Sequence, residues 1–369
     1  MIYLDHGATS WPKPETVRRS VLRALETCGN PGRGGYGLSM EGARTVYEAR
    51  RAAARLFHCT EDQVAFTTSC THGLNMAIRT LVSPGDRVVV SGFEHNAVTR
   101  TLHALKADLC AAGRKLFSWE DTLEHFEDEL RKGAKAAVFT HVSNVFGYVL
   151  PVGDMAYLCR KYRVPFILDA AQSAGHMPLD FGELGADFIA MPGHKGLLGP
   201  MGTGLLLCGR LPDPVFFGGT GSQSIQQEMP DFLPDRAEAG TVNVPGIAGL
   251  RAGMELVRQM DPKKIGEREA NLSCMAANAM ENLGIRVFHG PHQGGTLSFL
   301  PPDGDCETMA EKLGCRGICV RAGVHCAPLA HESAGTLQTG TVRVSFGYDS
   351  GCRDVRMLCN ALREICRVK

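Results

Sequence analysis

The stretch Asp187-Phe188-Ile189-Ala190-Met191-Pro192-Gly193-His194-Lys195-Gly196 decides the fold prediction, because it joins a short apolar run to a lysine on a tight turn. An apolar run without polar alternation is typical of a strand that is covered on both faces. A lysine just after such a strand is poorly placed for core packing and well placed for a cleft at the strand ends. Surface lysines are common, so Lys195 alone is also consistent with a solvated side chain.

Similar apolar runs recur between about residue 60 and residue 210. The predicted strands are Gln63–Phe66, Arg87–Val90, Ala136–Thr140, Val164–Leu168, Asp187–Met191 and Gly204–Cys208. Amphipathic stretches between them, such as residues 73–81, 121–132 and 155–162, predict helices. Alternation of strands and helices indicates an α/β fold in which helices cover both faces of a mostly parallel sheet.

The composition changes beyond this region. Residues 211–245 are rich in Pro, Gly, Gln and Ser, which predicts a long ordered loop or a domain junction, and residues 246–259 predict a long helix. The remainder, about 262–369, mixes helices with strands such as 296–299 and 341–346 and predicts a smaller α+β domain. We therefore expect a large domain over residues 16–250 and a small domain built from residues 1–15 and 251–369.

Charge and cysteine usage exclude several classes of function. Lys plus Arg equals Asp plus Glu at 39 each, so no global field favours nucleic acid or a membrane surface. No apolar run approaches the ~20 residues that span a bilayer, and the first residues lack the pattern of a signal peptide. The fourteen cysteines include no Cys-x-x-Cys pair, so we expect no metal site and mostly reduced, buried thiols. These features predict a cytoplasmic protein.

Two further features suit pyridoxal 5'-phosphate (PLP). In Ile167-Leu168-Asp169-Ala170-Ala171-Gln172, a carboxylate ends a predicted strand, and an anion that faces the pyridine nitrogen keeps the ring protonated as an electron sink. The hydroxyl-rich turn Phe66–Gly73 opens a predicted helix, where backbone N–H groups suit a phosphate. Each feature could also be an ordinary helix cap, but the two together with Lys195 on one sheet favour a PLP enzyme.

Asp169-Ala170-Ala171-Gln172 followed by Gly193-His194-Lys195 resembles the class V aminotransferase superfamily of fold-type I PLP enzymes. More narrowly, the chain is similar to the cysteine desulfurase and selenocysteine lyase branch with a short catalytic-cysteine loop. The similarity runs nearly end to end. The other matching segments are Tyr3–Thr9, Asn30–Tyr36, Phe93–Ala97, His141–Gly147, Glu238–Asn243, Arg321–Pro328 and Val342–Phe346.

The resemblance implies a role for each matching residue around the cofactor ring. Lys195 would carry PLP as a Schiff base and later move protons. Asp169 would pair with the ring nitrogen, and Gln172 would donate to the phenolic oxygen. His95 would stack on the ring and is a candidate proton carrier, while Asn144 would lie near both cofactor and substrate.

The resemblance also implies which residues bind the cofactor phosphate and the substrate carboxylate. Cys70 (through its backbone), Thr71 and His194 would bind the phosphate. Thr241 would reach the phosphate of a neighbouring subunit, which implies a homodimer with shared sites. Arg343 would clamp the substrate carboxylate bidentately.

Cys326 decides the type of reaction. In the matching segment of the family a thiolate takes sulfur from the substrate, releasing alanine and leaving a persulfide, and we expect His325 and Arg321 to favour the thiolate electrostatically. A buried structural cysteine is the alternative, but the surrounding Gly, His and Pro residues favour an exposed loop. Because the loop is short, an acceptor protein is expected to dock close to the site.

Three residues depart from the family pattern. Pro192 stands where Ser or Thr is usual, which removes one hydroxyl from the phosphate site and predicts a PLP affinity below the family norm. His72 replaces the usual Glu or Asp and could add positive charge there. His331 has no assigned role, and we expect it to anchor the loop rather than to catalyse.

Four functions remain open from the sequence. The first is an L-cysteine desulfurase, and the second is a selenocysteine lyase that uses the same residues. The third is a transaminase or related PLP enzyme without sulfur transfer. The fourth is a cofactor-binding protein that has lost turnover, against which the intact set of predicted catalytic residues argues.

Overall fold

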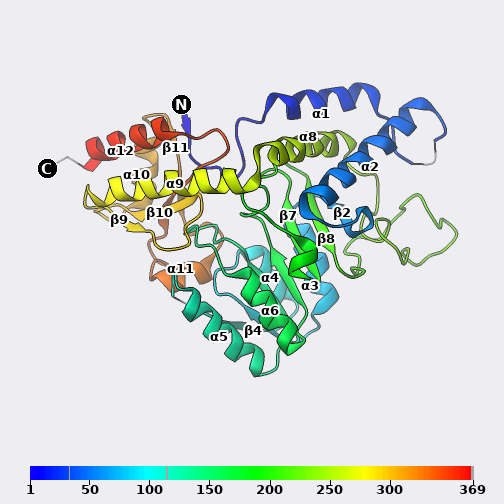
Figure 1. Cartoon of the computed structure of the whole chain (residues 1–369), viewed down its shortest axis with the longest axis horizontal. Coiled ribbons are helices and arrows are strands. Elements are labelled where there is room, and N and C mark those ends of the chain that lie inside the picture. The colour runs from blue at the N-terminus through cyan, green and yellow to red at the C-terminus, as the bar shows by residue number, and fades with distance from the viewer. Residues whose placement is uncertain (33, 114, 367–369) are drawn as a thin grey trace.

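The computed structural model describes residues 1–32, 34–113 and 115–366, and Figure 1 shows their arrangement. Arg33 of the matching segment Asn30–Tyr36 and residues 367–369 of the predicted small domain lie outside the described residues. The chain forms a large sheet covered by helices, with a smaller sheet beside it that carries the last part of the chain.

The large sheet has seven strands in the order β2-β8-β7-β6-β5-β3-β4. Strands β3 to β7 run parallel to one another, whereas β8 is antiparallel to both of its neighbours. This confirms the prediction of a mostly parallel sheet. The strands are β2 (Val64–Thr67), β3 (Arg87–Val90), β4 (Asp108–Ala111), β5 (Ala136–Thr140), β6 (Phe166–Asp169), β7 (Phe188–Pro192) and β8 (Gly204–Cys208).

Helices cover both faces of this sheet, which explains why its strands lack polar alternation. Neighbouring residues of one strand face opposite cores: Val138 packs with α3 (Cys70–Leu81) and α4 (Asn96–Ala104), whereas Ala137 packs on the other side. The helices of that second face are α2 (Gly37–Phe57), α5 (Trp119–Arg131), α6 (Val152–Tyr162) and α8 (Val244–Met260). Helix α1 (Glu15–Thr27) packs along α8 (Figure 1).

The smaller sheet is antiparallel, in the order β12-β13-β10-β9, and has its own core. Its strands are β9 (Arg286–Phe288), β10 (Thr296–Leu300), β12 (Arg321–Gly323) and β13 (Thr341–Ser345). The flanking helices are α9 (Pro262–Glu281), α10 (Cys306–Gly314) and α12 (Cys352–Cys366). The amino terminus joins this part, because β1 (Ile2–Tyr3) pairs with β11 (Ile318–Cys319).

The connections that remain include a long irregular segment. Residues 211–243 contain no helix or strand, as their composition predicted, and short helices lie at α7 (Phe181–Leu184) and α11 (Pro328–Ala334). No helix in the described part of the chain has both the length and the apolar character needed to cross a membrane.

The topology brings several sequence-distant residues to one edge of the large sheet. Strands β5, β6 and β7 are parallel neighbours, with Thr140 paired to Asp169 and Asp169 to Ala190. Their carboxyl ends therefore share one edge, where α/β proteins form ligand sites. Lys195 follows β7 at this same edge.

Candidate active site

One cavity of about 270 Å³ lies at this edge, between the large and the small sheet. It gathers residues from the loops after β2, β3, β5, β6 and β7 and from the segment between β12 and α11. Every predicted site residue except Thr241 lines it. These residues are Cys70, Thr71, His95, Asn144, Asp169, Gln172, His194, Lys195, Cys326 and Arg343.

Asp169 ends β6 as a buried carboxylate, only 2% exposed. Its Oδ1 accepts hydrogen bonds from the Ala171 backbone N–H at 2.9 Å and the Cys70 thiol at 3.5 Å. Its Oδ2 has no hydrogen-bond partner within the described residues. Since a buried carboxylate needs a compensating partner, this open oxygen suits a protonated ring nitrogen in the cavity.

The side-chain contact of Cys70 was not expected from the sequence, which assigned only its backbone to the site. Burial, followed by the neighbouring Asp169 charge, raises the pKa of the Cys70 thiol well above its usual range. Cys70 therefore stays protonated and donates to Asp169. Only the packing of the start of α3 against the end of β6 reveals this contact, and no local sequence signal encodes it.

Lys195 is partly buried on the turn that follows β7. Burial, and secondarily the positive charge of Arg343, lowers the pKa of its ammonium group. A lower pKa increases the fraction of neutral amine, the form that attacks an aldehyde or accepts a proton. The environment thus favours the reactive form of Lys195.

The phosphate side of the cavity is formed by the start of α3 and by His194. Ser69 caps α3 by accepting from the His72 N–H at 3.2 Å, and Cys70 and Thr71 in the first turn line the cavity. Free N–H groups at a helix start favour an anion. Burial lowers the pKa of His194 to about 4, so this side chain is neutral and binds an anion only by donating an N–H.

His72 does not supply the positive charge that the sequence suggested. It is absent from the residues that line the cavity, and its ring packs against Phe216 with 4.9 Å between ring centroids. Burial lowers its pKa, which keeps the imidazole neutral.

His95 lines the cavity from the start of α4, and Arg343 lines it from the small sheet. His95 precedes α4, and its Nδ1 accepts from the Ala97 N–H at 3.0 Å. Burial lowers the pKa of this imidazole as well. Arg343 lies on β13 and donates to the Asn144 backbone carbonyl at 3.0 Å and to Asp5 Oδ1 at 2.7 Å.

Cys326 is exposed to solvent on the segment between β12 and α11. Both His325 and Cys326 have left-handed backbone conformations, with φ of 48° and 57°, which non-glycine residues rarely adopt. Two hydrogen bonds hold the segment: Asn96 N–H donates to the Cys326 carbonyl and Asn144 Nδ2 donates to the His325 carbonyl, each at 2.7 Å. The prediction of an exposed loop is confirmed.

The prediction that His325 supplies positive charge is wrong. The ring is buried, with Nε2 3.1 Å from the Thr341 carbonyl, and burial followed by the Arg343 charge lowers its pKa to about 2. Arg321 lines the cavity and remains as a positive group near Cys326. His331 is fully buried, with its Nδ1 2.8 Å from Thr336 Oγ1, in a contact that anchors α11 to the following turn.

Thr241 lies away from this cavity. It lines a different hollow of about 770 Å³ together with Arg50 and Glu238. These two form a buried bidentate ion pair at 2.8 and 2.9 Å, and Glu238 also accepts from the Phe66 N–H at 2.7 Å. The pair fixes the segment that carries Thr241 to β2, while Thr241 itself remains exposed.

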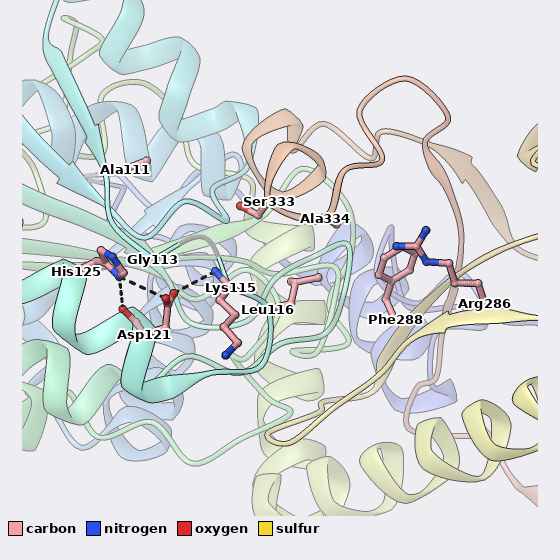
Figure 2. Close-up of a pocket in the computed structure, with 10 residues that line it drawn as sticks. All are labelled: Ala111, Gly113, Lys115, Leu116, Asp121, His125, Arg286, Phe288, Ser333 and Ala334. Atoms are coloured by element: carbon pink, nitrogen blue, oxygen red, sulfur yellow. Dashed lines mark hydrogen bonds and ion pairs between the residues drawn. The ribbon is translucent and has the colours of Figure 1, made fainter.

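Another cavity lies beside α11 and is shown in Figure 2. None of the predicted site residues lines it. Its acid, Asp121, is occupied by local contacts with the Lys115 backbone N–H at 3.1 Å and with His125 at 3.5 Å. The residues of Figure 2 therefore do not form a second catalytic cluster.

Comparisons with known proteins find relatives that match nearly the whole chain. A probable cysteine desulfurase of Methanothermobacter thermautotrophicus is 31% identical over 391 aligned positions, which cover 99% of this chain and 94% of the relative. A probable cysteine desulfurase of Pyrococcus abyssi is 31% identical with the same coverage. The apo structure of a cysteine desulfurase from Thermococcus onnurineus matches with a TM-score of 0.91 at 28% identity, covering 99% of this chain and 94% of that one.

The fold-type I architecture predicted from the sequence is confirmed by that structural match. The family model described as aminotransferase class-V matches residues 2–358, nearly the whole chain. The chain therefore belongs to the class-V aminotransferase family.

Proposed function

We propose that this protein is a PLP-dependent cysteine desulfurase that converts L-cysteine to L-alanine and captures the sulfur as a persulfide on Cys326. One observation carries the proposal: an exposed thiol lines the same small cavity as a buried carboxylate and an amine of lowered pKa. The similarity to probable cysteine desulfurases over nearly the whole chain supports it.

The residues of the cavity fit PLP. Asp169 offers the ring nitrogen a carboxylate oxygen that no described residue binds, the start of α3 offers N–H groups for the phosphate, and Lys195 offers an amine. His95, Gln172, Thr71 and His194 complete the proposed binding site. When bound, PLP supplies the electron sink that stabilises negative charge on the amino acid.

Side chains of the protein carry out substrate binding, proton transfer and sulfur transfer. Arg343 and Asn144 bind and orient the substrate, the former through its carboxylate. Lys195 moves the proton at the substrate Cα. The Cys326 thiolate attacks the substrate sulfur, so that an S–S bond forms as the C–S bond breaks, and the electron pair of that bond is taken up with a proton by the carbon that becomes the alanine methyl group.

We further propose a homodimer in which Thr241 completes the phosphate site of the partner. The segment that carries Thr241 exposes large apolar side chains, with Phe217 77% and Ile225 96% exposed, which suits burial against a second copy. A sulfur-acceptor protein then approaches the exposed Cys326. We place the reaction in the cytoplasm, since all fourteen cysteines are free.

The test is to incubate the PLP-loaded protein with L-cysteine and a thiol reductant and to quantify L-alanine and sulfide. Equal yields of the two products are expected, and Lys195→Ala should yield neither. Selenocysteine, offered separately, measures the preference between sulfur and selenium. Formation of pyridoxamine phosphate without sulfide would instead support a transaminase and overturn the proposal.

A further inference from the structure

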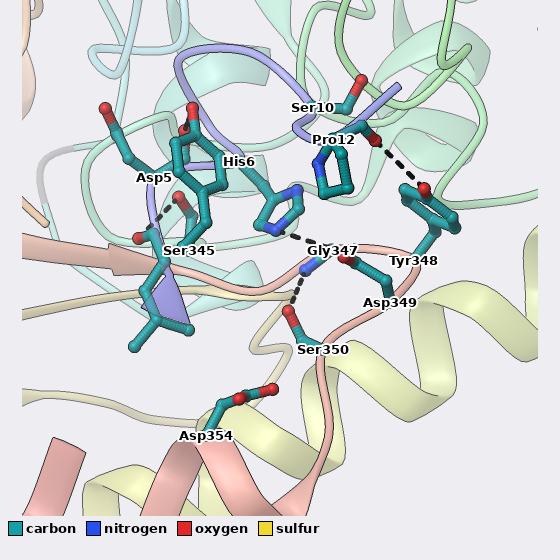
Figure 3. A network of polar contacts seen from close by, with 12 residues as sticks. Asp5, His6, Ser10, Pro12, Ser345, Gly347, Tyr348, Asp349, Ser350 and Asp354 are labelled. Atoms are coloured by element: carbon teal, nitrogen blue, oxygen red, sulfur yellow. Dashed lines mark hydrogen bonds and ion pairs between the residues drawn. The ribbon is translucent and has the colours of Figure 1, made fainter. Parts of the chain in front are cut away.

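Residues 4–13 form a segment, here called the N-terminal strap, that runs from β1 towards the active-site cavity. The small sheet holds one side of it, as Figure 3 shows. Gly7 N–H donates to Ser345 Oγ at 2.7 Å. Tyr348 Oη donates to the Pro12 carbonyl at 3.0 Å, as Figure 3 shows. His6 Nε2 lies 3.5 Å from Asp349 Oδ1.

The other side of the strap contacts residues of the proposed cofactor site. Gln172 Nε2 donates to the Gly7 carbonyl at 3.0 Å. The carbonyl of His194, just before Lys195, accepts from the Ser10 N–H at 3.0 Å and from Lys13 Nζ at 2.8 Å. Gly7 also lines the cavity. The strap therefore links the small sheet to the loops of the large sheet.

Asp5 forms an ion pair between the strap and Arg343. Its Oδ1 accepts from Arg343 Nη2 at 2.7 Å, and no other acidic side chain in the described part of the chain lies within ion-pair distance of Arg343. Arg343 is only 2% exposed, and a buried guanidinium without a counter-charge is strongly destabilised. Asp5 is thus the group that compensates the buried charge.

The guanidinium is fixed at both ends by these contacts. Nη2 binds Asp5, and Nη1 binds the Asn144 carbonyl at 3.0 Å. Each terminal nitrogen carries two N–H groups, so one N–H of each remains after these bonds. Gly7 makes room for this arrangement, because a Cβ at that position would lie 3.3 Å from Arg343 Cζ.

We propose that Asp5 is a positioning residue that holds the Arg343 guanidinium ready for the substrate α-carboxylate. The inference rests on the proposed function, in which Arg343 binds that carboxylate. A long arginine side chain that is already oriented loses less freedom when the substrate binds. Asn144 connects the Arg343 guanidinium to the Cys326 segment, since its carbonyl accepts from Arg343 and its Nδ2 donates to the His325 carbonyl beside Cys326.

The experiment compares Asp5→Ala and Asp5→Asn with wild-type enzyme. Asp5→Ala should raise the KM for L-cysteine at least about tenfold, with kcat changed less than about threefold, because an interaction made equally in ground and transition states is lost. Asp5→Asn keeps an acceptor for Nη2 but not the counter-charge, so it should restore only part of the lost affinity. Asp349→Asn is the matched control, since Asp349 contacts the strap at His6, and should leave both constants unchanged.

Inhibition separates a role in carboxylate binding from general damage. Inhibition by L-alanine should weaken in Asp5→Ala by the same factor as the KM, whereas inhibition by cysteamine, which lacks the carboxylate, should not change. Equal weakening for both inhibitors, or an unchanged KM in Asp5→Ala, overturns the role of Asp5. Wild-type enzyme that forms no alanine from L-cysteine contradicts the proposed function instead, so the two failures are distinguishable.

Discussion

The two sides of the active-site cavity are built in different ways. On the cofactor side, Asp169 ends β6 and Lys195 follows β7, where both faces of the sheet are covered and neighbouring strands fix the backbone. On the sulfur side, Cys326 sits on an exposed segment with left-handed backbone geometry. The charged groups of Asp169 and Lys195 are thus held at the edge of the sheet. The Cys326 thiol, which has to reach a sulfur acceptor, lies on an exposed segment outside the sheet.

Two cysteines illustrate this difference within one cavity. Cys70 belongs to the cofactor side, where burial raises its thiol pKa well above the usual range and the protonated thiol donates a hydrogen bond to Asp169. Cys326 is exposed on the other side. Only an accessible thiol that can ionise serves as a nucleophile, so the two residues carry the same functional group but have different roles.

Replacement of these two cysteines gives the largest expected effect. Cys326→Ser should reduce alanine formation at least about 100-fold, because serine is a far weaker nucleophile at neutral pH, while PLP binding is retained. Cys70→Ser keeps a donor for Asp169 and should lose less than about tenfold. Both rates are measured with L-cysteine as substrate.

Cys352→Ser serves as the control for exposed cysteines, since Cys352 is also exposed but lies at the start of α12. It should behave as wild type. Full activity in Cys326→Ser would show that the Cys326 thiol is not the nucleophile. The proposed difference in role between Cys326 and Cys70 would then be wrong.

Lowering the pH should reduce the free energy of unfolding through His325, on the sulfur side of the cavity, and this effect is intermediate in size. Burial lowers the pKa of His325 to about 2, against about 6.5 in an unfolded chain. The unfolded state therefore binds more protons than the folded state below pH 6.5, and stability is lost as the pH falls. From pH 7 to pH 5, His325 should contribute a loss of roughly 2 kcal/mol in the free energy of unfolding.

Urea denaturation at the two pH values measures this loss. His325→Gln removes the titrating ring but keeps an N–H donor for the Thr341 carbonyl, so its loss between pH 7 and pH 5 should be smaller by about the same 2 kcal/mol. An identical pH dependence in the variant and the wild type would mean that the buried ring is not held neutral.

Pro192→Ser, on the cofactor side, should give the smallest effect, which is an increase in PLP affinity. Pro192 ends β7 and lines the cavity, where a hydroxyl could donate to the phosphate. One hydrogen bond to a charged group is worth ~1.5–3 kcal/mol, so PLP should bind about tenfold more tightly or better. Titration of the apo-protein with PLP, followed by absorbance, measures the change; no gain in affinity would contradict the predicted weakness of the phosphate site.

The sequence predicted the cofactor side better than the sulfur side. Asp169 and Lys195 each follow a buried apolar run, and parallel strands bring such ends together by topology. The neutral state of His325 depends on burial by distant segments, so no local pattern shows it. The contacts of Cys70 with Asp169 and of Asp5 with Arg343 join residues that are far apart in the chain.

Other expectations depend on features that a single chain does not contain. Thr241 lies outside the cavity, so its assignment to a partner's phosphate site stays a prediction. The domain boundaries at residues 15–16 and 250–251 also stay predictions. The edge strand β4 (Asp108–Ala111) was missed, because its residues are at best partly buried and include none of the β-branched residues that are typical of strands such as β3.

The most direct test of the central claim is to locate the cofactor on the chain. Purified protein is loaded with PLP, reduced with borohydride to make the attachment permanent, and digested for peptide mass spectrometry. We expect the cofactor mass on the peptide that contains Lys195, and none on Lys195→Ala protein. Attachment to a different lysine, or no attachment in the wild-type protein, would show that Lys195 does not carry PLP.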